Sequence, residues 1–477
     1  MRLFNTLSGK KELLERPKKG PLKLFVCGPT VYDDQHIGNF RTAVFFDLFV
    51  RFLRARKFDV FFLQNITDID DKILARSAEK NESWQTLAHR YETTYYETLK
   101  KYNVISIDTF ARATDHIPEI IAQVEVLIKK GHTYKIPDDG WYFDLATFPE
   151  YGKLARRTIE GAEDAVSRID ESEKKRNKGD FCVWKLVKTR MNIDIKITDR
   201  HGWIVIDGEP AWPSGFGWGR PGWHIEDTAV SERFFGPQYD IHGGGLDLKF
   251  PHHEAEIAQQ ESASGKKPFV KIWMHAGMLQ VDGEKMSKSK GNFITAPAFL
   301  ETGSADLFRF LVFMHHYRKP LEYSELLLVQ AAQSILDIRL FLAKLELQNA
   351  RTQKKAAVFE LKKYTDAFVA ALEDDFNSPK ALSIIFDLLR AGNAFVWKLS
   401  PRAKREITAF LTETFTMLGF QNIRGILSPE VQKRARARDR ARIKKEFSRS
   451  DELRSEIEKL GYSVEDTPHG QIVVQKP

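Results

Sequence analysis

Cysteine, export features and long apolar runs are scarce in this chain, and each scarcity excludes a class of protein. Only two cysteines occur among 477 residues, Cys27 and Cys182, which argues against a disulfide framework, so each is expected to be a free thiol or a metal ligand. No uninterrupted apolar run approaches the roughly 20 residues that cross a bilayer, so no membrane span is expected. Residues 1–20 mix charges without the apolar core of an export signal, which favours a cytoplasmic location.

Length and charge suggest several domains and admit a polyanionic partner. A chain of 477 residues is expected to form roughly two to four domains, and its 42% hydrophobic content is ordinary for a globular protein. A net charge of +8 suits a nucleic acid or a plain solubility surface. Lysine and arginine concentrate in residues 431–449, which are either a solvated helix or a nucleic-acid contact.

The N-terminal third has the pattern of a parallel sheet. Residues 22–27 form a short apolar run, residues 39–58 carry a helical pattern with apolar positions on several faces, and residues 60–66 form a second apolar run. This strand, helix and strand order predicts an α/β domain whose binding sites lie beyond the carboxyl ends of the strands.

The middle of the chain interrupts this pattern and then returns to it. An amphipathic helix is expected at residues 115–131, followed by a hairpin around Asp139 and Gly140, within an inserted module that extends to about residue 210. The sheet then resumes, with strands expected at residues 239–241 and 271–279 and a helix at residues 251–263.

The C-terminal part is predicted to be helical and then mixed. Apolar positions recur at helical spacing in residues 324–345, 356–376 and 379–399, and residues 451–477 suggest a small unit of one helix and strands. The predicted organisation is a Rossmann-type catalytic domain in two halves (1–110 and 211–290), an inserted connective module (111–210), connecting helices (291–323), a helical bundle (324–427) and a small basic unit (428–477).

Two short segments favour a nucleotide. His36-Ile-Gly-Asn39 follows the first strand and opens a helix, where backbone N–H groups attract anions, although an ordinary turn with a capping asparagine has the same pattern. Residues 285–289 (KMSKS) place Lys285 and Lys288 between glycines, where they can stabilise a leaving pyrophosphate; the alternative is a basic surface loop. Because both segments follow strands of one sheet, together they predict ATP binding and adenylyl transfer to a small acid.

A third group has the chemistry of a metal site. His252 and Glu256 are spaced i, i+4, so they lie on one face of the predicted helix, with His253 and Glu254 beside them. Cys27 ends the first strand and can reach the same edge of the sheet, which would add a sulfur donor. Taken locally, the histidine and glutamate are also compatible with a simple surface contact.

Two acidic segments leave their roles open. Asp68, Asp70 and Asp71 either hold magnesium or cap the helix that follows, and the cap is favoured for Asp68. Residues 222–226 (GWHIE) combine an aromatic ring with titratable groups and fit either a site or a buried core.

Taken together, these segments resemble the class I aminoacyl-tRNA synthetases, and the cysteinyl-tRNA synthetases among them. The resemblance covers nearly the whole chain and rests on FVCGPTVYDDQHIGN, FLQNITDIDDK, GRPGWHIE, IHGGGLDLKFPHHEAEIAQ, WMHAGML and KMSKSKGN. It implies a two-step reaction in which the cysteine carboxylate attacks the ATP α-phosphate and tRNA(Cys) then takes the cysteinyl group. It also implies that the bundle and the basic unit bind tRNA, with Phe447 or Tyr462 available to stack on a base.

The resemblance also assigns residues to roles. It implies catalytic roles for His36, Asn39, Lys285 and Lys288. It implies ATP binding, with magnesium, by these four and by Gly28, Thr30, Gly38, His242, Gly243, Gly244 and Met278. It implies cysteine binding by Cys27, Thr67, Trp223 and Asp247, and a zinc ion held by Cys27, Asp227, His252 and Glu256.

Two positions depart from the family pattern. Asp227 stands where the family usually has cysteine, and a carboxylate oxygen can still ligate zinc. Asn39 stands where the motif commonly ends in histidine, and an amide can donate to a phosphate but carries no charge. Zinc would select the thiolate over serine, so no editing domain is expected. A monomer is expected; a ligase that passes cysteine to a small amine and a silent tRNA-binding regulator are the alternatives.

Overall fold

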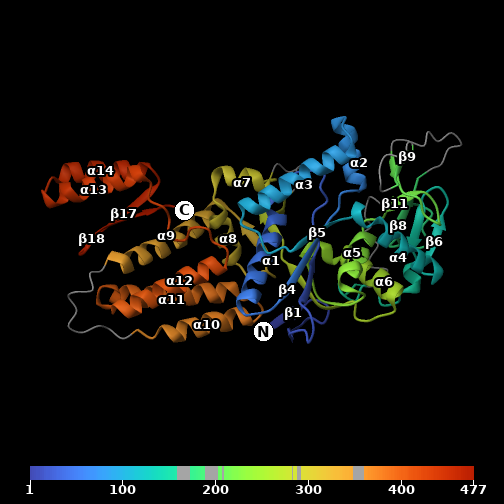
Figure 1. The fold of residues 1–477 in the computed structure, drawn as a ribbon, viewed down its shortest axis with the longest axis horizontal. Helices are drawn as coiled ribbons and strands as arrows, with labels where there is room; N and C mark the ends of the chain where they lie inside the picture. The colour runs from blue at the N-terminus through green and yellow to red at the C-terminus, as the bar shows by residue number, and fades with distance from the viewer. Residues whose placement is uncertain (158–171, 188–201, 207–208, 282, 287–291, 348–358) are drawn as a thin grey trace.

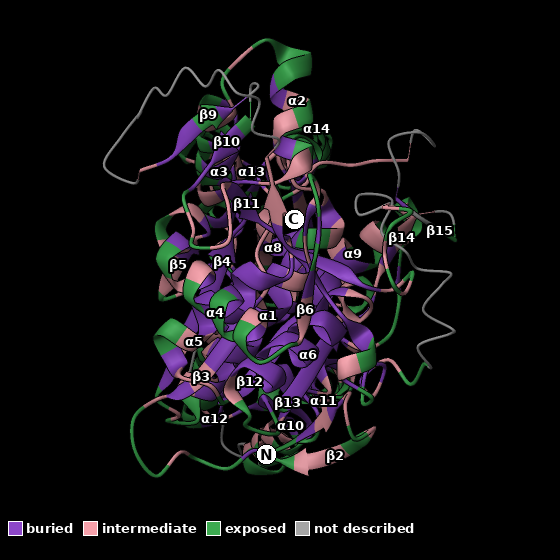
Figure 2. Ribbon diagram, turned by 90° about the vertical axis from the view of Figure 1, so that its right-hand side faces the viewer, coloured by how far each residue is buried: buried purple, intermediate pink, exposed green. Residues whose placement is uncertain are grey.

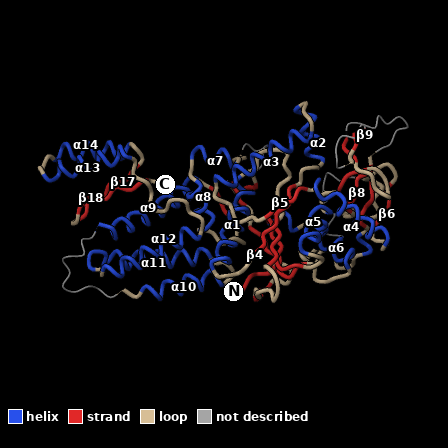
Figure 3. The backbone as a smooth tube through the Cα atoms, viewed as in Figure 1, coloured by secondary structure: helices blue, strands red, loops and turns tan. Residues whose placement is uncertain are grey.

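The computed structural model describes residues 1–157, 172–187, 202–206, 209–281, 283–286, 292–347 and 359–477. A parallel sheet lies near the middle of an elongated molecule, between a smaller sheet at one end and a helical bundle at the other (Figure 1). Strands gather in the middle and at the end with the smaller sheet, whereas helices form most of the bundle end (Figure 3). This arrangement agrees with the predicted α/β domain followed by a helical region.

The central sheet has five strands in the order β13-β12-β3-β4-β5, and all its pairings are parallel. From β3 the chain proceeds to β4 and β5 on one side and returns later to β12 and β13 on the other. Strand order therefore reverses between β3 and β12, which in open α/β sheets is where ligands bind. The strands are β3 (Leu22–Val26), β4 (Val60–Ile66), β5 (Thr109–Arg112), β12 (Tyr239–Gly245) and β13 (Val270–Ala276), and all but β5 were predicted.

Helices cover both faces of this sheet because successive side chains of each strand point to opposite sides. Leu24 and Val26 of β3 belong to the core that contains α1, whereas Phe25 belongs to the core that contains α4, α5 and α6. The bounds are α1 (Ile37–Ala55), α4 (Ile117–Lys129), α5 (Ile225–Phe235) and α6 (His252–Ser264). The predicted helices at residues 39–58, 115–131 and 251–263 are confirmed.

The smaller sheet is antiparallel and has the order β11-β8-β7-β6. The predicted hairpin is confirmed: β6 and β7 pair antiparallel, Asp139 lies in the turn between them, and Gly140 begins β7. Since β11 pairs with β8, the sheet continues past residue 210, where the insert was expected to end. Its strands are β6 (Thr133–Ile136), β7 (Gly140–Phe143), β8 (Phe181–Leu186) and β11 (Gly219–Pro221).

Four described helices form the bundle: α9 (Glu325–Leu347), α10 (Leu361–Glu373), α11 (Ser378–Phe395) and α12 (Pro401–Met417). The first three correspond to the predicted helical segments, and α12 was not predicted as a helix. Within the described part of the chain, α9 is the one helix whose length and hydropathy of 1.6 match a membrane span. Its buried residues, including Ile335, Ile338 and Phe341, pack in the core shared with the other bundle helices. This is the composition of a core helix in a bundle.

The last unit consists of two helices and a hairpin, close to the predicted unit of one helix and strands. It contains α13 (Pro429–Ile443), α14 (Phe447–Lys459), β17 (Tyr462–Thr467) and β18 (Gly470–Gln475). The other elements are β1 (Arg2–Asn5), β2 (Lys10–Leu13), α2 (Asp71–Lys80), α3 (Trp84–Lys101), β9 (Ile204–Ile206), β10 (Glu209–Ala211), β14 (Leu279–Val281), β15 (Glu284–Lys285), α7 (Ala296–Thr302), α8 (Ala305–Phe313) and β16 (Leu321–Tyr323).

The most buried helix of the central domain is also a polar one. Around α1, β3, β12 and β13 the chain is buried, and α6 lies within this region (Figure 2). All residues of α6 except its last are buried, including two histidines and three glutamates. Such groups are rarely buried unless they are paired or bind a ligand, so α6 marks the candidate site.

Candidate active site and metal cluster

A cavity of about 380 Å³ opens at the carboxyl end of the central sheet, beside the reversal between β3 and β12. Its walls come from the segments that follow β3, β4 and β13, from the start of α1, and from α5 and α6. Twelve of the residues predicted for the site line it: Cys27, Gly28, Thr30, His36, Gly38, Asn39, Thr67, Trp223, Asp227, Asp247, His252 and Met278.

Three residues of the predicted nucleotide segment are not among the residues that line this cavity. The His242 ring is fully buried behind Cys27, and its Nε2 lies 3.3 Å from the Cys27 Sγ. A Cβ on Gly243 would lie 2.2 Å from the Phe46 ring, and one on Gly244 would lie 2.9 Å from the His253 ring. These two glycines therefore allow side chains to pack closely on β12, and only the next residue, Gly245, lines the cavity.

The predicted lysine loop is described only at its edges. Lys285 ends β15, and its backbone pairs with Gln280 of β14. Met286 lines the cavity. Lys288 lies outside the described residues. The strand that precedes the loop therefore borders the site, as expected from its position after a strand of the central sheet.

The start of α1 faces the cavity. The His36 side chain is the N-cap, since its Nδ1 accepts a hydrogen bond from the Asn39 backbone N–H at 3.3 Å. The cap is thus His36, whereas the alternative interpretation of this segment expected a capping asparagine. The Asn39 amide donates to Gln35 Oε1 at 2.6 Å. The first N–H groups of a helix lack intrahelical acceptors and favour an anion, so this wall suits a phosphate.

Asn65, for which no role was predicted, connects three parts of the site through its side-chain amide and its neighbour Thr67. Its Oδ1 accepts from the Gly28 backbone N–H at 2.6 Å, and its Nδ2 donates to Asp227 Oδ1 at 2.5 Å. Two residues further, the Thr67 hydroxyl donates to Glu226 at 2.9 Å. Burial, and then the charge of Asp227, raise the pKa of Glu226 well above its usual range. The signal that could have found Asn65 is its place in the FLQNITDIDDK motif.

The acidic residues after β4 have separate structural partners. Asp70, not Asp68, caps α2, accepting from the Lys72 backbone N–H at 2.9 Å. The prediction of a cap for Asp68 is wrong, because its carboxylate instead accepts from the backbone N–H of Thr114 at 3.0 Å and from its hydroxyl. Asp71 pairs with Arg220 and Lys185. None of these three carboxylates lines the cavity, so the described geometry gives no support to a magnesium site here.

The four predicted metal donors come together at the base of the cavity. One donor atom from each of Cys27, Asp227, His252 and Glu256 lies within 4.8 Å of the others. His252 Nε2 is 3.0 Å from Asp227 Oδ2 and 3.0 Å from Glu256 Oε1, and the Cys27 Sγ is 3.8 Å from the same Glu256 oxygen. The four side chains that the resemblance grouped therefore lie close together, and their role as metal ligands stays a prediction.

The electrostatics of this cluster suit a cation. Burial, and then the charges of Asp227 and Glu256, raise the pKa of the Cys27 thiol well above its usual range. Burial alone would lower the pKa of His252, but the carboxylates of Glu256 and Asp227 raise it to about 10. Glu256 Oε2 is fully buried and has no hydrogen-bond partner. A buried carboxylate oxygen without a hydrogen bond, beside a thiol and an imidazole, fits a divalent metal ion.

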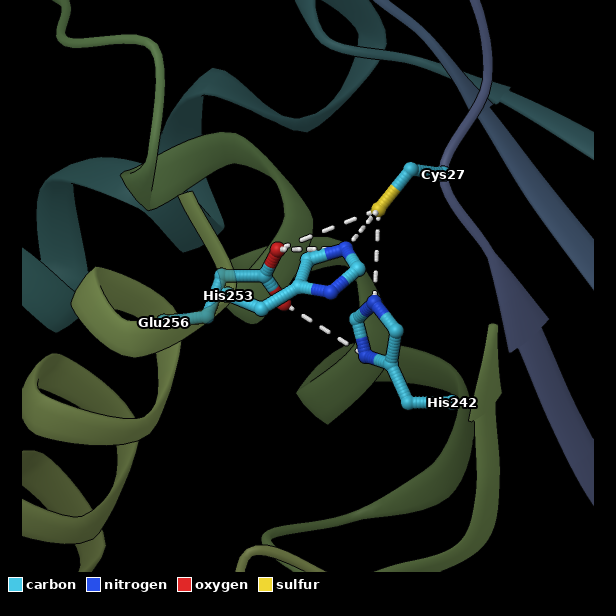
Figure 4. Close-up of side chains that lie close together, drawn as sticks. All are labelled: Cys27, His242, His253 and Glu256. Carbon is cyan, nitrogen blue, oxygen red and sulfur yellow. Dashed lines mark hydrogen bonds and ion pairs between the residues drawn. The ribbon is translucent and has the colours of Figure 1, made fainter. Parts of the chain in front are cut away.

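Further histidines surround the same thiol. Cys27 directly follows β3, His242 comes from β12, and His253 and Glu256 come from α6 (Figure 4). These four residues also place one donor atom each within 4.8 Å of the others. His242 was predicted for the nucleotide and His253 was noted only as a neighbour of His252, so this second grouping was not predicted.

Family models match nearly the whole chain. Residues 14–333 match the class I (C) catalytic domain of tRNA synthetases, and residues 367–422 match a DALR domain. Residues 425–473 match the cysteinyl-tRNA ligase anticodon binding domain. The first match covers the central domain, the second lies in the bundle, and the third covers most of the last unit.

Known proteins of similar length align from end to end. The cysteine–tRNA ligase of Coxiella burnetii is 39% identical over 486 residues, covering 98% of this chain and 99% of that protein. Those of Brevibacillus brevis and Legionella pneumophila are 38% and 37% identical, each covering 98% of both chains. Mycobacterium tuberculosis methionyl-tRNA synthetase in complex with methionyl-adenylate shares the fold, with a TM-score of 0.63 at 15% identity over 85% of this chain and 92% of that one. The chain belongs to the cysteine–tRNA ligase family of class I aminoacyl-tRNA synthetases and attaches cysteine to tRNA.

Proposed function

We propose that the 380 Å³ cavity binds ATP and L-cysteine side by side and forms cysteinyl-adenylate, which then transfers its cysteinyl group to tRNA(Cys). The observation that carries the proposal is the juxtaposition of two unlike walls in one cavity. One wall is the N-terminus of α1, which favours phosphate, and the other contains the thiol, imidazole and carboxylate donors. Holding both substrates in one orientation supplies much of the catalysis that such a reaction needs.

On the ATP side, the backbone at Gly28, Gly38 and Met278 would contact the nucleotide, and His36 and Asn39 would contact the triphosphate, with magnesium carried by ATP. Lys285 and Lys288 would neutralise the charge that develops on the leaving pyrophosphate. Asn39 donates a hydrogen bond but adds no positive charge. The lysines therefore carry most of the positive charge expected at this step.

On the amino-acid side, zinc is the ion that the donors of Cys27, Asp227, His252 and Glu256 suit best. Bound zinc would take the substrate thiolate as a ligand, and its preference for sulfur over a hydroxyl oxygen would exclude serine. Trp223 would cover the bound side chain, since its ring stacks on His252 at a centroid distance of 4.4 Å. Thr67 and Asp247 also line the cavity and would contact the amino acid.

For tRNA(Cys), the helical bundle and the last unit would provide the binding surface, and the last unit would read the anticodon. Of the two rings expected to stack on a base, Phe447 is 62% exposed at the start of α14. Tyr462 is 7% exposed, and its hydroxyl bonds to the backbone of Ser428 and Ile426. Phe447 is therefore the ring available to a base. The enzyme would act as a cytoplasmic monomer.

Cysteine-dependent exchange of pyrophosphate into ATP tests the proposal. We expect exchange with cysteine, none with serine, and transfer of cysteine to tRNA(Cys) after exchange. Failure of exchange at saturating cysteine with added zinc would refute the proposed chemistry. Normal exchange, together with transfer to a small amine but not to tRNA, would contradict the proposed acceptor.

A further inference from the structure

The Cys27 thiol lies against two imidazole rings as well as against the donors assigned to zinc above. Its Sγ is 3.1 Å from His253 Nε2 and 3.3 Å from His242 Nε2 (Figure 4). Sulfur and nitrogen ligands of one tetrahedral zinc ion lie about 3.5 Å apart, given bond lengths of about 2.3 and 2.0–2.1 Å. The two rings therefore already have nearly the spacing from the thiol that a shared ion would require.

Each of these rings is oriented by a partner on its other nitrogen. His242 Nδ1 is 2.7 Å from the Tyr239 hydroxyl, and His253 Nδ1 is 2.8 Å from His275 Nε2. The His275 ring in turn has its Nδ1 2.9 Å from the Thr6 hydroxyl. Histidines that bind metals usually have such an outer partner, which holds the ring and directs the other nitrogen to the ion. Both Nε2 atoms are directed at the Cys27 sulfur in this way.

Glu256 supplies a fourth donor on this inner side. Its Oε1 lies 3.8 Å from the Cys27 Sγ and 4.0 Å from His253 Nε2. Its Oε2 is 3.4 Å from His242 Nδ1 but has no hydrogen-bond partner, although the carboxylate is fully buried. A buried carboxylate oxygen without a hydrogen bond is costly unless a cation approaches it.

The inner donors differ from the assigned set in chemistry and in access. The assigned set offers one sulfur, one nitrogen and two oxygens, and Cys27, Asp227 and His252 line the cavity. The inner set offers one sulfur, two nitrogens and one oxygen, and its two histidines and its glutamate are fully buried. Imidazole suits zinc better than a second carboxylate does, and four protein donors without an open position are typical of a retained ion.

We propose that Cys27, His242, His253 and Glu256 form an inner metal site that holds a zinc-type divalent ion without Asp227 or His252. The inference rests on the proposed zinc function and extends it. Because the two sets share Cys27 and Glu256, one ion occupies one set at a time. An ion in the inner set would be held mainly by fully buried side chains, whereas an ion in the outer set would lie beside Asp227 and His252, which line the cavity where the substrate thiol would bind. The inner set thus retains the metal close to the site of use.

Cobalt binding to the full-length protein tests this site. Metal is removed with a chelator, cobalt(II) is added, and bound cobalt is measured by equilibrium dialysis and by its visible and charge-transfer absorption. The outer variant Asp227→Asn/His252→Gln is expected to keep about one cobalt per chain with a sulfur-to-cobalt band. Adding His253→Gln to it should weaken binding at least tenfold, whereas adding His224→Gln should not, because His224 contacts His252 but is no donor of the inner set.

The result that would overturn the inner site is an outer variant that folds, by circular dichroism, but binds no cobalt. If His242→Gln/His253→Gln then still binds one cobalt, the assigned outer set stands and only the inner site is wrong. If the wild-type chain binds no cobalt or zinc, both assignments fail. Should the outer variant not fold, zinc X-ray absorption of the single variant Asp227→Asn decides the matter: two imidazole ligands support the inner site, and one refutes it.

Discussion

Arg41 offers the sharpest test of how the fold positions the proposed nucleotide pocket. Its side chain lies buried on α1 and donates to four backbone carbonyls. Nη1 bonds to Gly277 at 2.6 Å and to Met278 at 2.7 Å, and Nη2 bonds to Lys319 at 2.5 Å and to Tyr317 at 3.3 Å. The first two carbonyls belong to the segment that lines the cavity and leads into β14 and β15.

Replacing Arg41 with lysine keeps a positive charge but removes the planar fork. Burial lowers the pKa of Arg41 to about 10, so the guanidinium is still charged at neutral pH. The three N–H groups of lysine start from one nitrogen and cannot reach both pairs of carbonyls. Each buried carbonyl left without a donor costs about 1–3 kcal/mol. The Met278 carbonyl also accepts from the Leu321 backbone N–H, and the Tyr317 carbonyl from that of Gly277, so losing one pair leaves one carbonyl without a donor. We therefore expect the variant Arg41→Lys to be less stable by about 1–3 kcal/mol.

Two assays read out this change. For a domain of about 150–250 residues, 1 kcal/mol lowers Tm by about 2–4 °C, so Tm should fall by at least about 2 °C. Cysteine-dependent pyrophosphate exchange should show a raised KM for ATP, because the cavity-lining segment at Gly277 loses its hydrogen bonds to the Arg41 side chain. The matched control is Arg54→Lys on the same helix, whose guanidinium is one-third exposed and pairs with Asp108. An Arg41→Lys variant with wild-type Tm and exchange would refute the reasoning.

Three further predictions concern separate parts of the chain. Lys288→Ala should lower exchange about 10²–10³-fold by removing a charge that stabilises pyrophosphate, and full exchange in this variant would contradict that role. Phe447→Ala should raise the KM for tRNA about 5- to 150-fold, since stacking on a base contributes about 1–3 kcal/mol, with exchange unchanged; Leu460→Ala, exposed at the other end of α14, is the control, and equal effects would argue against stacking. Burial raises the pKa of Asp68 to about 6, against the hydrogen bonds from Thr114, so its folded-state pKa lies above its unfolded value. The stability that this group contributes is present below about pH 4 and is lost as pH rises through about 6. Between pH 4 and 7 the free energy of unfolding of the wild type should therefore fall by up to about 3 kcal/mol relative to that of Asp68→Asn. A difference in urea unfolding that does not change with pH would contradict the assignment.

The sequence by itself determined most of the secondary structure and the family. The predicted strand at residues 60–66 has the same bounds as β4, Pro251 precedes α6, and the turn at Asp139 and Gly140 forms the predicted hairpin. These features depend on neighbouring residues, because periodicity, caps and turn residues act within a few positions. The resemblance also grouped Cys27 with Asp227, His252 and Glu256, whose side chains lie close together in the structure, since motif order carries information that local propensity lacks.

Only the tertiary structure decided which chemically similar residue takes which role. Both Asp68 and Asp70 can cap a helix, but packing brings Thr114 to Asp68 and leaves the cap to Asp70. Phe447 and Tyr462 are both aromatic, yet the packing of the last unit buries the tyrosine and leaves the phenylalanine exposed. His242, assigned to the nucleotide by its motif, lies behind the Cys27 thiol instead. These outcomes depend on distances between segments far apart in the chain, and such distances are set by how the sheet and helices pack.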